Sequence, residues 1–485
     1  MSLSTCNTNT LQALNDQVLD FFQLEGLAGS PPNKILSPEE KSCEKQFVDK
    51  HKRTDLGNFV VDLPFKNKSI MLGHSETMAR NRFFTLERKL LKNMELRHQY
   101  IQFMREYEQL GHMQLVSDIS SENSYFIPHH AVIKNTTQGN KLRVVFDASM
   151  TSSNGHSLND NLLIGPNLQQ ELFLILLKFR TYKYVISADI EKMYRQIFLT
   201  ENHQQFQRIF WRENVSDPLQ IYQLKTVTYG TASAPYLAMR CLKQLALENM
   251  NVLPVAASNI LNNFYMDDLI CGSSTLEEAL ALRDDIIQIL NQGNFKLHKW
   301  ASNEPTLLPE TDIKASVNFS SDTETKTLGL IWNCHKDQLK YNLALNRLPS
   351  KTTKRTILAT VATIFDPLGL ITPVILKAKL LLQSLWAAQI GWDDPIPSDL
   401  EYHWNQFLIN LPDVKNIEIS RHIFRNDTPN IVELHGFADA STKGFGAAIY
   451  IKTILSSTET HTQLLCAKSR VAPLKTISLP RLELS

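Results

Sequence analysis

Residues 261–270 read Leu-Asn-Asn-Phe-Tyr-Met-Asp-Asp-Leu-Ile and place two adjacent carboxylates, Asp267 and Asp268, between short apolar runs. The flanking pairs, Phe264–Tyr265 and Leu269–Ile270, predict two short strands, so the Met-Asp step falls in a tight hairpin. Neighbouring carboxylates repel each other, and a protein tolerates that cost where a divalent cation neutralises them. On its own, an Asp-Asp pair in a turn is more often a solvated turn than a metal site.

A third carboxylate upstream changes that balance. Residues 184–194 read Tyr-Val-Ile-Ser-Ala-Asp-Ile-Glu-Lys-Met-Tyr, which predicts an apolar strand that ends on Asp189. One carboxylate at a strand end and two at a hairpin are what a two-metal phosphoryl-transfer site needs, because its two ions lie roughly 3.5–4 Å apart and are held by oxygens. Oxygen ligands suit Mg²⁺ and Mn²⁺ alike, so the sequence leaves the metal open.

The Tyr-Met-Asp-Asp hairpin, taken with the Asp189 strand, resembles the palm of reverse transcriptases. The sequences of residues 125–134, 141–149 and 227–235 resemble those of the Pao (BEL/Pao) group of LTR retrotransposons. This resemblance extends from about residue 40 to the end of the chain. It implies an α+β right-hand polymerase of fingers, palm and thumb, followed by the first part of an RNase H-like domain.

The resemblance also implies the reaction and its partners. An RNA-directed DNA polymerase adds deoxynucleoside triphosphates to a primer 3′-hydroxyl on an RNA or DNA template. Asp189, Asp267 and Asp268 would be the catalytic metal ligands for two Mg²⁺ ions, chiefly through the first two.

Four residues correspond by resemblance to nucleotide-binding positions. Arg143 and Lys134 would hold the triphosphate, because guanidinium and ammonium groups neutralise its oxygens. Lys141 is a weaker candidate, since a lysine on an exposed hairpin is usually only solvated. Tyr194 matches the aromatic that lies under the sugar and excludes a 2′-hydroxyl. Tyr229 stands where some retroviral relatives carry Gln, which leaves its nucleotide contacts open.

Downstream motifs resemble the rest of a polymerase site. Residues 326–332 match the hairpin that grips the primer end, with Leu328 and Gly329 at its turn, where glycine lets the backbone approach closely. The strand in residues 293–300 carries the lysine that would protonate pyrophosphate. The sequence does not decide between Lys296 and Lys299 for that role.

The motifs divide the chain into a leader or adaptor (1–75), fingers and palm (76–335), thumb and connection (336–430) and a truncated RNase H-like domain (431–485). Ser37-Pro-Glu-Glu reads as a helix start. No Asp-Thr-Gly or Asp-Ser-Gly triplet occurs. We therefore expect neither the protease nor the integrase of this family in this chain.

The C-terminal segment predicts an incomplete RNase H-like module. Asp439 would be its first metal ligand and Glu483 its second. The further carboxylates that such a site needs do not follow before Ser485. We expect this module to be inactive and its unpaired strands to expose a sheet edge.

Basic residues concentrate between positions 341 and 380. Six of them face a single acid, Asp366, a local excess of 6 − 1 = +5; they are Arg347, Lys351, Lys354, Arg355, Lys377 and Lys379. Such a stripe predicts salt-sensitive binding along a duplex backbone by a thumb-like clamp, and the alternative is a solvated helix face.

Bulk composition narrows the class of protein further. The chain has 485 residues, 43% of them hydrophobic, and 50 Lys and Arg against 49 Asp and Glu, so its net charge of +1 argues neither for nor against nucleic acid. Six scattered cysteines without Cys-x-x-Cys spacing predict no zinc site and no disulfide framework. The N-terminus lacks signal-peptide regions, and no apolar run reaches the ~18–20 residues of a membrane span. We expect a soluble, cytoplasmic protein, including within virus-like particles; its oligomeric state is open.

A second function stays open at this stage. The chain could be a catalytically silent, nucleic-acid-binding remnant of a retrotransposon. The missing protease, integrase and RNase H end favour that alternative, whereas the three aspartates, Tyr194 and Arg143 favour an active polymerase. A metal-binding structural hairpin unrelated to polymerases would require every motif match to be chance.

Overall fold

The computed structural model describes nine stretches of the chain, namely residues 35–67, 72–116, 124–136, 139–309, 324–341, 351–424, 431–456, 458–474 and 477–483. Its α-helices are α2 (Pro38–Lys50), α3 (Glu76–Leu91), α4 (Met94–Gln109), α5 (Leu158–Asn161), α6 (Leu172–Thr181), α7 (Glu201–Gln204), α8 (Ala234–Asn249), α9 (Pro254–Asn262), α10 (Leu276–Asn291), α12 (Lys354–Val361), α13 (Thr372–Ala387), α14 (Ser398–Asn410) and α15 (Leu479–Glu483). Short 3₁₀ turns include η1 (Met193–Gln196). None of the helices in these stretches is long and apolar enough to cross a membrane.

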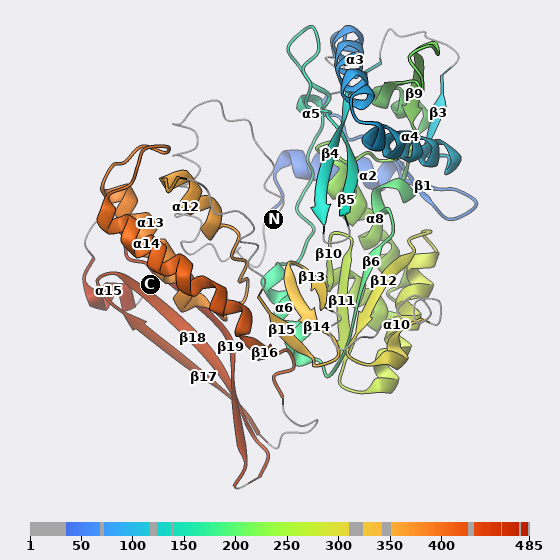
Figure 1. Cartoon of the computed structure of the whole chain (residues 1–485). Coiled ribbons are helices and arrows are strands. Elements are labelled where there is room, and N and C mark those ends of the chain that lie inside the picture. The colour runs from blue at the N-terminus through green and yellow to red at the C-terminus, as the bar shows by residue number, and fades with distance from the viewer. Residues whose placement is uncertain are drawn as a thin grey trace.

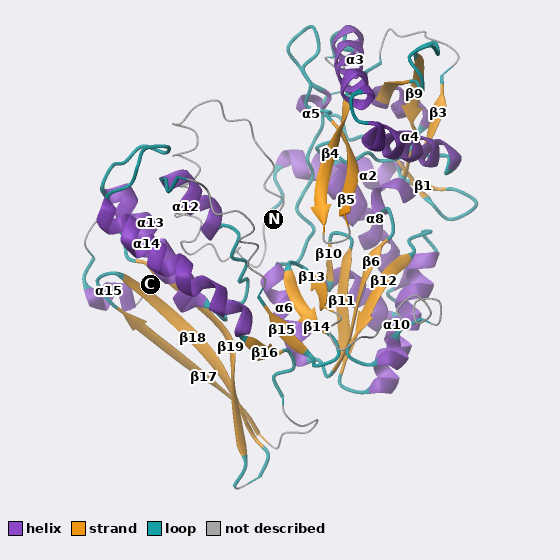
Figure 2. Ribbon diagram, viewed as in Figure 1, coloured by secondary structure: helices purple, strands orange, loops and turns teal. Residues whose placement is uncertain are grey.

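In the part of the chain that the structure describes, the strands fall into six sheets; Figure 2 colours the strands orange. They are β1 (Lys52–Arg53), β2 (Phe59–Val61), β3 (Met113–Leu115), β4 (His129–Thr136), β5 (Gly139–Phe146), β6 (Tyr184–Ile190), β7 (Phe198–Leu199), β8 (Arg208–Trp211), β9 (Gln220–Leu224), β10 (Phe264–Tyr265), β11 (Asp268–Ser273), β12 (Leu297–Ser302), β13 (Glu324–Thr327), β14 (Leu330–Asn333), β15 (Gln338–Lys340), β16 (Glu418–Ser420), β17 (Ile431–Ala440), β18 (Gly444–Ile454) and β19 (Thr460–Val471).

A four-stranded antiparallel sheet of order β10-β11-β6-β12 lies at the centre of the fold. The β6 run is almost wholly apolar because both of its faces are covered, so its residues are buried in succession and do not alternate. Helix α10 packs against β6 and β11 on one face, and α6 packs against β11 (Figure 1). This is the arrangement expected for a palm.

The fingers lie above this sheet in Figure 1 and consist of α3, α4, the β4–β5 hairpin and the β3-β9-β8 sheet. The hairpin extends from the fingers toward the middle of the molecule (Figure 1). It pairs in one continuous register from His129↔Phe146 to Thr136↔Gly139.

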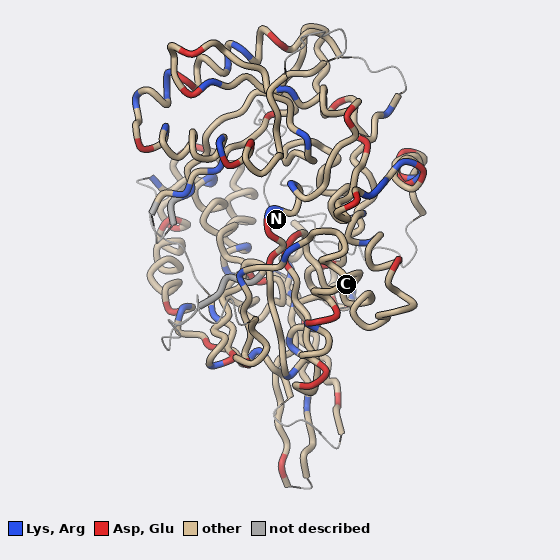
Figure 3. Tube along the Cα trace, turned by 90° about the vertical axis from the view of Figure 1, so that its right-hand side faces the viewer, with Lys and Arg blue, Asp and Glu red and all other residues tan. Residues whose placement is uncertain are grey.

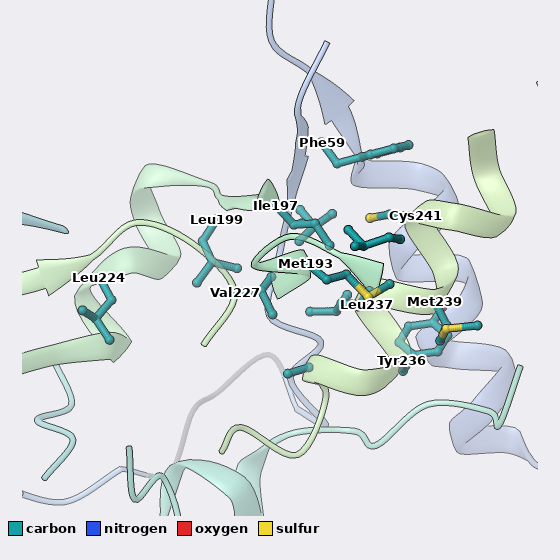
Figure 4. Close-up of a cluster of buried hydrophobic side chains, with 14 of the residues drawn as sticks. Phe59, Met193, Ile197, Leu199, Leu224, Val227, Tyr236, Leu237, Met239 and Cys241 are labelled. Atoms are coloured by element: carbon teal, nitrogen blue, oxygen red, sulfur yellow. The ribbon is translucent and has the colours of Figure 1, made fainter. Parts of the chain in front are cut away.

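One hydrophobic core joins the fingers to one side of the palm, and we call it the first core. Part of it appears in Figure 4, where Met193 and Val227 lie near Leu237 and Cys241 of α8, with Phe59 of β2 above them. All five side chains are buried. This core fixes the segment that directly follows the Asp189 strand against α8.

The predicted leader contributes to this core as far as the structure describes it. Ser37 and Glu40 form the predicted capping box at the start of α2. Glu44 of α2 then accepts hydrogen bonds from Tyr236 and Arg240 of α8, both at 3.0 Å. Residues 35–67 are therefore an integral part of the fold, not a separate adaptor; residues 1–34 lie outside the described part.

A second core lies under the other face of the palm sheet. It joins α6 to the β13-β14-β15-β16 sheet and to helices α12, α13 and α14. Trp332 is fully buried at its centre, and its indole donates to Asp337 at 3.0 Å. Because Tyr265 and Leu328 both pack against this core, the aspartate hairpin and the predicted primer-grip turn share one support.

Two fully buried arginines link the palm to the segments that follow it. Arg421 forms two hydrogen bonds of 2.6 Å with Asp337. Arg180 of α6 donates to the carbonyls of Leu464 at 2.8 Å and Leu465 at 2.6 Å, where β19 bulges against β18. The second core and β19 are therefore fixed together by hydrogen bonds as well as by packing.

The C-terminal sheet, β17-β18-β19, is an antiparallel meander. Helix α13 packs on β19 and α15 contacts β17 (Figure 1). Strand β17 stands at the edge of the sheet and leaves Leu434 and Phe437 exposed. The predicted exposed edge is therefore present among the residues that the structure describes.

The predicted basic stripe is only partly exposed. Lys354 is buried, with its ammonium 3.7 Å from the centre of the Trp386 ring, so the prediction that it lies on an exposed basic surface is wrong. Arg355 is exposed but forms a two-pronged ion pair with Asp393 at 2.8 and 2.9 Å. Arg347 lies outside the described residues. The exposed lysines of this stretch that the structure describes are Lys351 and Lys377.

Candidate active site

The three predicted metal ligands meet at one end of the palm sheet. In the antiparallel β6–β11 pair Asp268 lies directly across from Asp189, and the backbone N–H of Ile190 donates to the Asp267 carbonyl at 2.8 Å. Residues from two separate sequence motifs are thus brought together by strand register alone. Asp267 is exposed, while Asp189 and Asp268 are half-buried.

The hairpin that carries the aspartates is a two-residue turn. Tyr265 pairs with Asp268, which leaves Met266 and Asp267 as the turn residues. Met266 has φ of +57°, a left-handed conformation that hairpin turns of this length require and that glycine usually supplies. A methionine there carries backbone strain of about 1 kcal/mol or more, which is typical of residues held in place at functional sites.

The third strand supplies a cation. His298 of β12 lies across from Asp189, and the register then shifts before Ala301. Within this bulge Lys299 has φ of +53°, and its ammonium contacts the Asp189 carboxylate. Bulges redirect side chains beside active sites, and this one brings Lys299, not Lys296, to the aspartates. His298 Nε2 lies 3.5 Å from the same Asp189 carboxylate.

Electrostatics at this end of the sheet favour an added cation. Desolvation and the charge of Asp189 raise the pKa of Asp267. Desolvation, Asp267 and Asp189 raise the pKa of Asp268 to about 6, and Lys299 only partly offsets this. Carboxylates that resist ionisation beside one another are stabilised by a divalent ion, so the donor set fits Mg²⁺ or Mn²⁺.

The ligands are not yet arranged around one point. Among the residues that the structure describes, no three His, Cys, Asp or Glu side chains form a preassembled metal-binding cluster. Lys299 already neutralises part of the Asp189 charge. A metal ion at these aspartates would compete with Lys299 for the Asp189 carboxylate.

Tyr194 lies beside this site. It belongs to η1, directly after the Asp189 strand, and is half-buried. Burial and the nearby Asp267 raise the pKa of its phenol to about 12, so the ring is neutral at physiological pH. The turn is held from the fingers, because Lys192 pairs with Glu106 of α4 at 2.8 Å.

The β4–β5 hairpin presents the predicted triphosphate-binding residues on one face. Lys134 lies directly opposite Lys141, and Arg143 lies opposite Val132 on the same face. All three basic side chains are exposed. Like charges placed directly opposite each other destabilise a hairpin, and a bound anion relieves that repulsion. The geometry thus groups Lys141 with Lys134 and Arg143.

Tyr229 joins the hairpin to the palm. Its hydroxyl donates to the Val144 carbonyl at 2.7 Å, and its ring lies 5.4 Å from that of Phe146. Burial raises the pKa of the Tyr229 phenol, and the charge of Arg143 acts on it in the opposite direction. The structure thus brings Tyr229 and Arg143 together.

The side chain of Asn159 also contacts this loop, through the carbonyl of Gly230 and the N–H of Ala232. No role was predicted for Asn159 from the sequence. An asparagine following a helix-start serine is too common a turn signal to have identified it.

The predicted primer-grip residues form the turn between β13 and β14. Leu328 and Gly329 have φ of +49° and +89°, and Thr327 pairs with Leu330. A β-carbon on Gly329 would lie 2.7 Å from the Phe365 ring, so this glycine meets both a backbone and a packing requirement.

The two predicted RNase H-like ligands lie in the C-terminal sheet region. Asp439 is exposed on β17, across from Gly446, and Glu483 is exposed at the end of α15. Helix α15 contacts β17. Their role as metal ligands stays a prediction, as does the absence of RNase H activity.

Comparison with known proteins identifies both modules. Residues 120–302 match the family described as reverse transcriptase (RNA-dependent DNA polymerase), and residues 353–485 match the Pao retrotransposon-like RNaseH-like domain. The two matches together fit a Pao reverse transcriptase with an RNase H-like region. The second match begins at α12, so in this chain it includes the helices predicted as thumb and connection, as well as the C-terminal sheet.

A solved structure has a similar fold. The foamy viral protease-reverse transcriptase dRH, determined in complex with double-stranded DNA, aligns with a TM-score of 0.51 at 15% identity, covering 96% of this chain and 70% of that one. No curated protein matches the chain. The predicted α+β right-hand fold with an RNase H-like region is confirmed, whereas the roles of individual site residues stay predictions.

Proposed function

We propose that this Pao reverse transcriptase adds deoxynucleotides to a primer 3′-hydroxyl on an RNA or DNA template by a two-metal mechanism. The observation that carries the proposal is the register of β6 and β11, which places Asp268 across from Asp189 and Asp267 at the adjoining turn. Three carboxylates at one sheet end, with raised pKa values at Asp267 and Asp268, suit a pair of divalent ions.

Asp189 and Asp267 would hold the ions, with Asp268 in a lesser role. When bound, Mg²⁺ or Mn²⁺ would lower the pKa of the attacking hydroxyl and neutralise charge on the phosphates. Lys299, released from Asp189, would be free to hold a proton near the departing pyrophosphate. The chain's own contribution would be mainly positional, as in other phosphoryl-transfer enzymes.

The incoming nucleotide would lie between the hairpin and the palm. Lys134, Arg143 and Lys141 would neutralise the triphosphate from one face of β4–β5. Tyr229 would form the wall of the nucleotide pocket at the base of the hairpin. Tyr194, whose phenol is affected by the nearby Asp267, would lie under the sugar, and its ring would leave no space for a 2′-hydroxyl.

A primer–template duplex is the expected macromolecular partner. The foamy viral relative was determined with double-stranded DNA. In this chain Lys and Arg alternate with Asp and Glu along the trace, with no uniformly basic side in the view of Figure 3. Duplex binding should therefore depend on individual exposed lysines such as Lys351 and Lys377 and should weaken as salt rises.

Primer extension on an RNA template with Mg²⁺ tests the proposal. Asp267→Asn should reduce extension by about a hundredfold or more, because it removes a metal ligand and keeps the side-chain shape. Duplex binding should remain within twofold of the parent. Asp284→Asn, on the exposed face of α10 beside Arg283, is the matched control and should extend normally.

The opposite outcome has a defined meaning. If the folded parent binds primer–template but adds no nucleotide with either Mg²⁺ or Mn²⁺, the chain is a nucleic-acid-binding remnant and the polymerase proposal fails. Equal extension by the parent and Asp267→Asn would reject the assignment of the aspartate site.

The sugar preference has its own test. Tyr194→Val should raise incorporation of ribonucleotides relative to deoxynucleotides by about tenfold or more, because the smaller side chain opens space for a 2′-hydroxyl. The ratio of kcat/KM for the two sugars is the measurement. An unchanged ratio would show that Tyr194 only packs.

A further inference from the structure

The side-chain amide of Asn159 bonds the loop that carries Tyr229 to the segment that follows β5. Asn159 Nδ2 donates to the Gly230 carbonyl at 3.0 Å and to Ser149 Oγ at 2.8 Å. Its Oδ1 accepts from the backbone N–H of Ala232 at 2.8 Å. All of the hydrogen-bonding groups on this amide are therefore directed at the junction between fingers and palm.

The Tyr229–Ala232 loop approaches the end of β5 very closely. Gly230 has φ of +102°, and a β-carbon there would lie 2.2 Å from the Phe146 carbonyl at the end of β5. The loop can approach β5 this closely only because residue 230 has no side chain. The Tyr229 hydroxyl bond to Val144 fixes the other side of the same contact.

Asn159 itself is held firmly. It lies in α5, whose start is closed by a capping box between Ser157 and Asp160. Its backbone N–H donates to the Ala148 carbonyl at 3.1 Å. An amide on a capped turn that is bonded to three partners has lost its rotamer freedom, so it can keep the loop bonded to it in a fixed place.

We infer that Asn159 is a positioning residue that holds the Tyr229–Ala232 loop on the Arg143 strand and so sets the shape of the pocket for the incoming deoxynucleoside triphosphate. This inference rests on the proposed function. Asn159 acts through Tyr229 and Arg143 and does not itself touch the nucleotide. Its loss should weaken nucleotide binding more than chemistry or duplex binding.

Asn159→Asp is the sharpest test because the side chain keeps its shape and its acceptor but loses both donors. The new carboxylate would also face the Gly230 carbonyl, which repels it. Asn161→Asp in the same short helix is the control, since the Asn161 amide donates to Ser157 at 2.9 Å, within the turn.

Two readouts separate this inference from the polymerase proposal. The first is steady-state extension, where Asn159→Asp should raise KM for the nucleotide by about tenfold and change kcat by less than threefold. The second needs no chemistry: a primer ended with a dideoxynucleotide is mixed with the next complementary nucleotide, and the stable ternary complex is measured by gel shift. The variant should need about tenfold more nucleotide to form it.

The outcomes are distinguishable. A parent that neither extends nor forms the ternary complex would reject the proposed function itself. A sound parent with Asn159→Asp within twofold of it in both readouts would overturn the positioning role. Equal loss of nucleotide binding, duplex binding and thermal stability would show a merely structural role and would also overturn it.

A less disruptive variant covers the case in which Asn159→Asp fails to fold. Ser149→Ala removes only the 2.8 Å bond that Asn159 makes to this hydroxyl. It should raise KM for the nucleotide two- to threefold, in the range of one lost neutral hydrogen bond, with the melting temperature unchanged. No change in KM would count against the inference.

Discussion

The ammonium of Lys299 contacts the carboxylate of Asp189 across the bulge in β12. Lys299 is mostly exposed, with 65% of its side chain accessible, whereas Asp189 is 20% accessible. The cation can therefore leave the site at little cost, while the carboxylate stays. In this state the lysine supplies the positive charge that a divalent ion would otherwise bring.

This contact predicts competition between Lys299 and metal. Lys299→Met should tighten binding of Mn²⁺ to the free protein by about three- to tenfold, because no ammonium has to leave Asp189. Electron paramagnetic resonance of free Mn²⁺ measures the affinity. Lys296→Met, three positions away with an exposed side chain, is the control and should bind as the parent does. Weaker binding by Lys299→Met would contradict the prediction.

Stability should depend on pH through Asp268. Its pKa is raised to about 6 from an ordinary value of 3.8, so the metal-free folded protein binds this proton more tightly than the unfolded chain. The contribution that tighter binding of this proton makes to folding stability is present below about pH 4. It is lost as the pH rises through about 6. At pH 7.5, Asp268→Asn should melt on the order of 2–4 °C above the parent.

The same comparison at low pH is the control for that prediction. Below about pH 3 the carboxyl is largely protonated in both the folded and unfolded states, so the two melting temperatures should converge. A difference that persists at low pH would assign the effect to packing. Saturating Mg²⁺ should reverse the order at pH 7.5, because only the parent keeps the full set of carboxylates.

Replacing Lys354 should affect stability, whereas replacing Lys377 should affect duplex binding. The Lys354 ammonium lies 3.7 Å from Trp386 and 5.2 Å from Trp392, so Lys354→Met should cost about 1–2 kcal/mol of stability and leave duplex binding unchanged. Lys377 is exposed on α13, so Lys377→Met should weaken duplex binding and reduce the salt slope by about 1. Thermal melts and binding at several salt concentrations measure the two effects.

Replacing the buried Arg421 should destabilise the protein even when the new residue keeps the charge. Arg421→Lys keeps the charge but cannot form the two parallel bonds to Asp337 or reach the carbonyls of Tyr182 and Lys183. We expect a loss of about 3–5 kcal/mol, the cost of breaking a buried pair. Arg355→Lys alters an exposed two-pronged pair and should cost less than about 1 kcal/mol. Similar losses for both variants would contradict this account.

Local sequence patterns were sufficient for the elements that carry the chemistry. The strand ending near Asp189, the hairpin at Asp267 and the capped start of α2 at Ser37 all appear where residue order predicts them. Helix α9 (Pro254–Asn262) was not predicted at all, since its short apolar pattern has no distinctive signal.

The tertiary structure decided which side chains meet. Sequence left Lys296 and Lys299 equivalent, and only the β12 bulge brings Lys299 to Asp189. Composition grouped Lys354 with exposed basic residues, but two tryptophans from other segments enclose it. Asn159 gained its partners from a loop far along the chain.

The physical reason for this division is the separation along the chain of the residues that interact. Turn geometry, helix capping and strand alternation depend on residues a few positions apart, so they can be read from residue order. A bulge, a buried cation or a hydrogen bond between distant loops depends on how whole elements pack, which no local pattern records. The sequence by itself therefore determined the catalytic motifs and the polymerase class, and the tertiary structure decided how their charges are balanced and positioned.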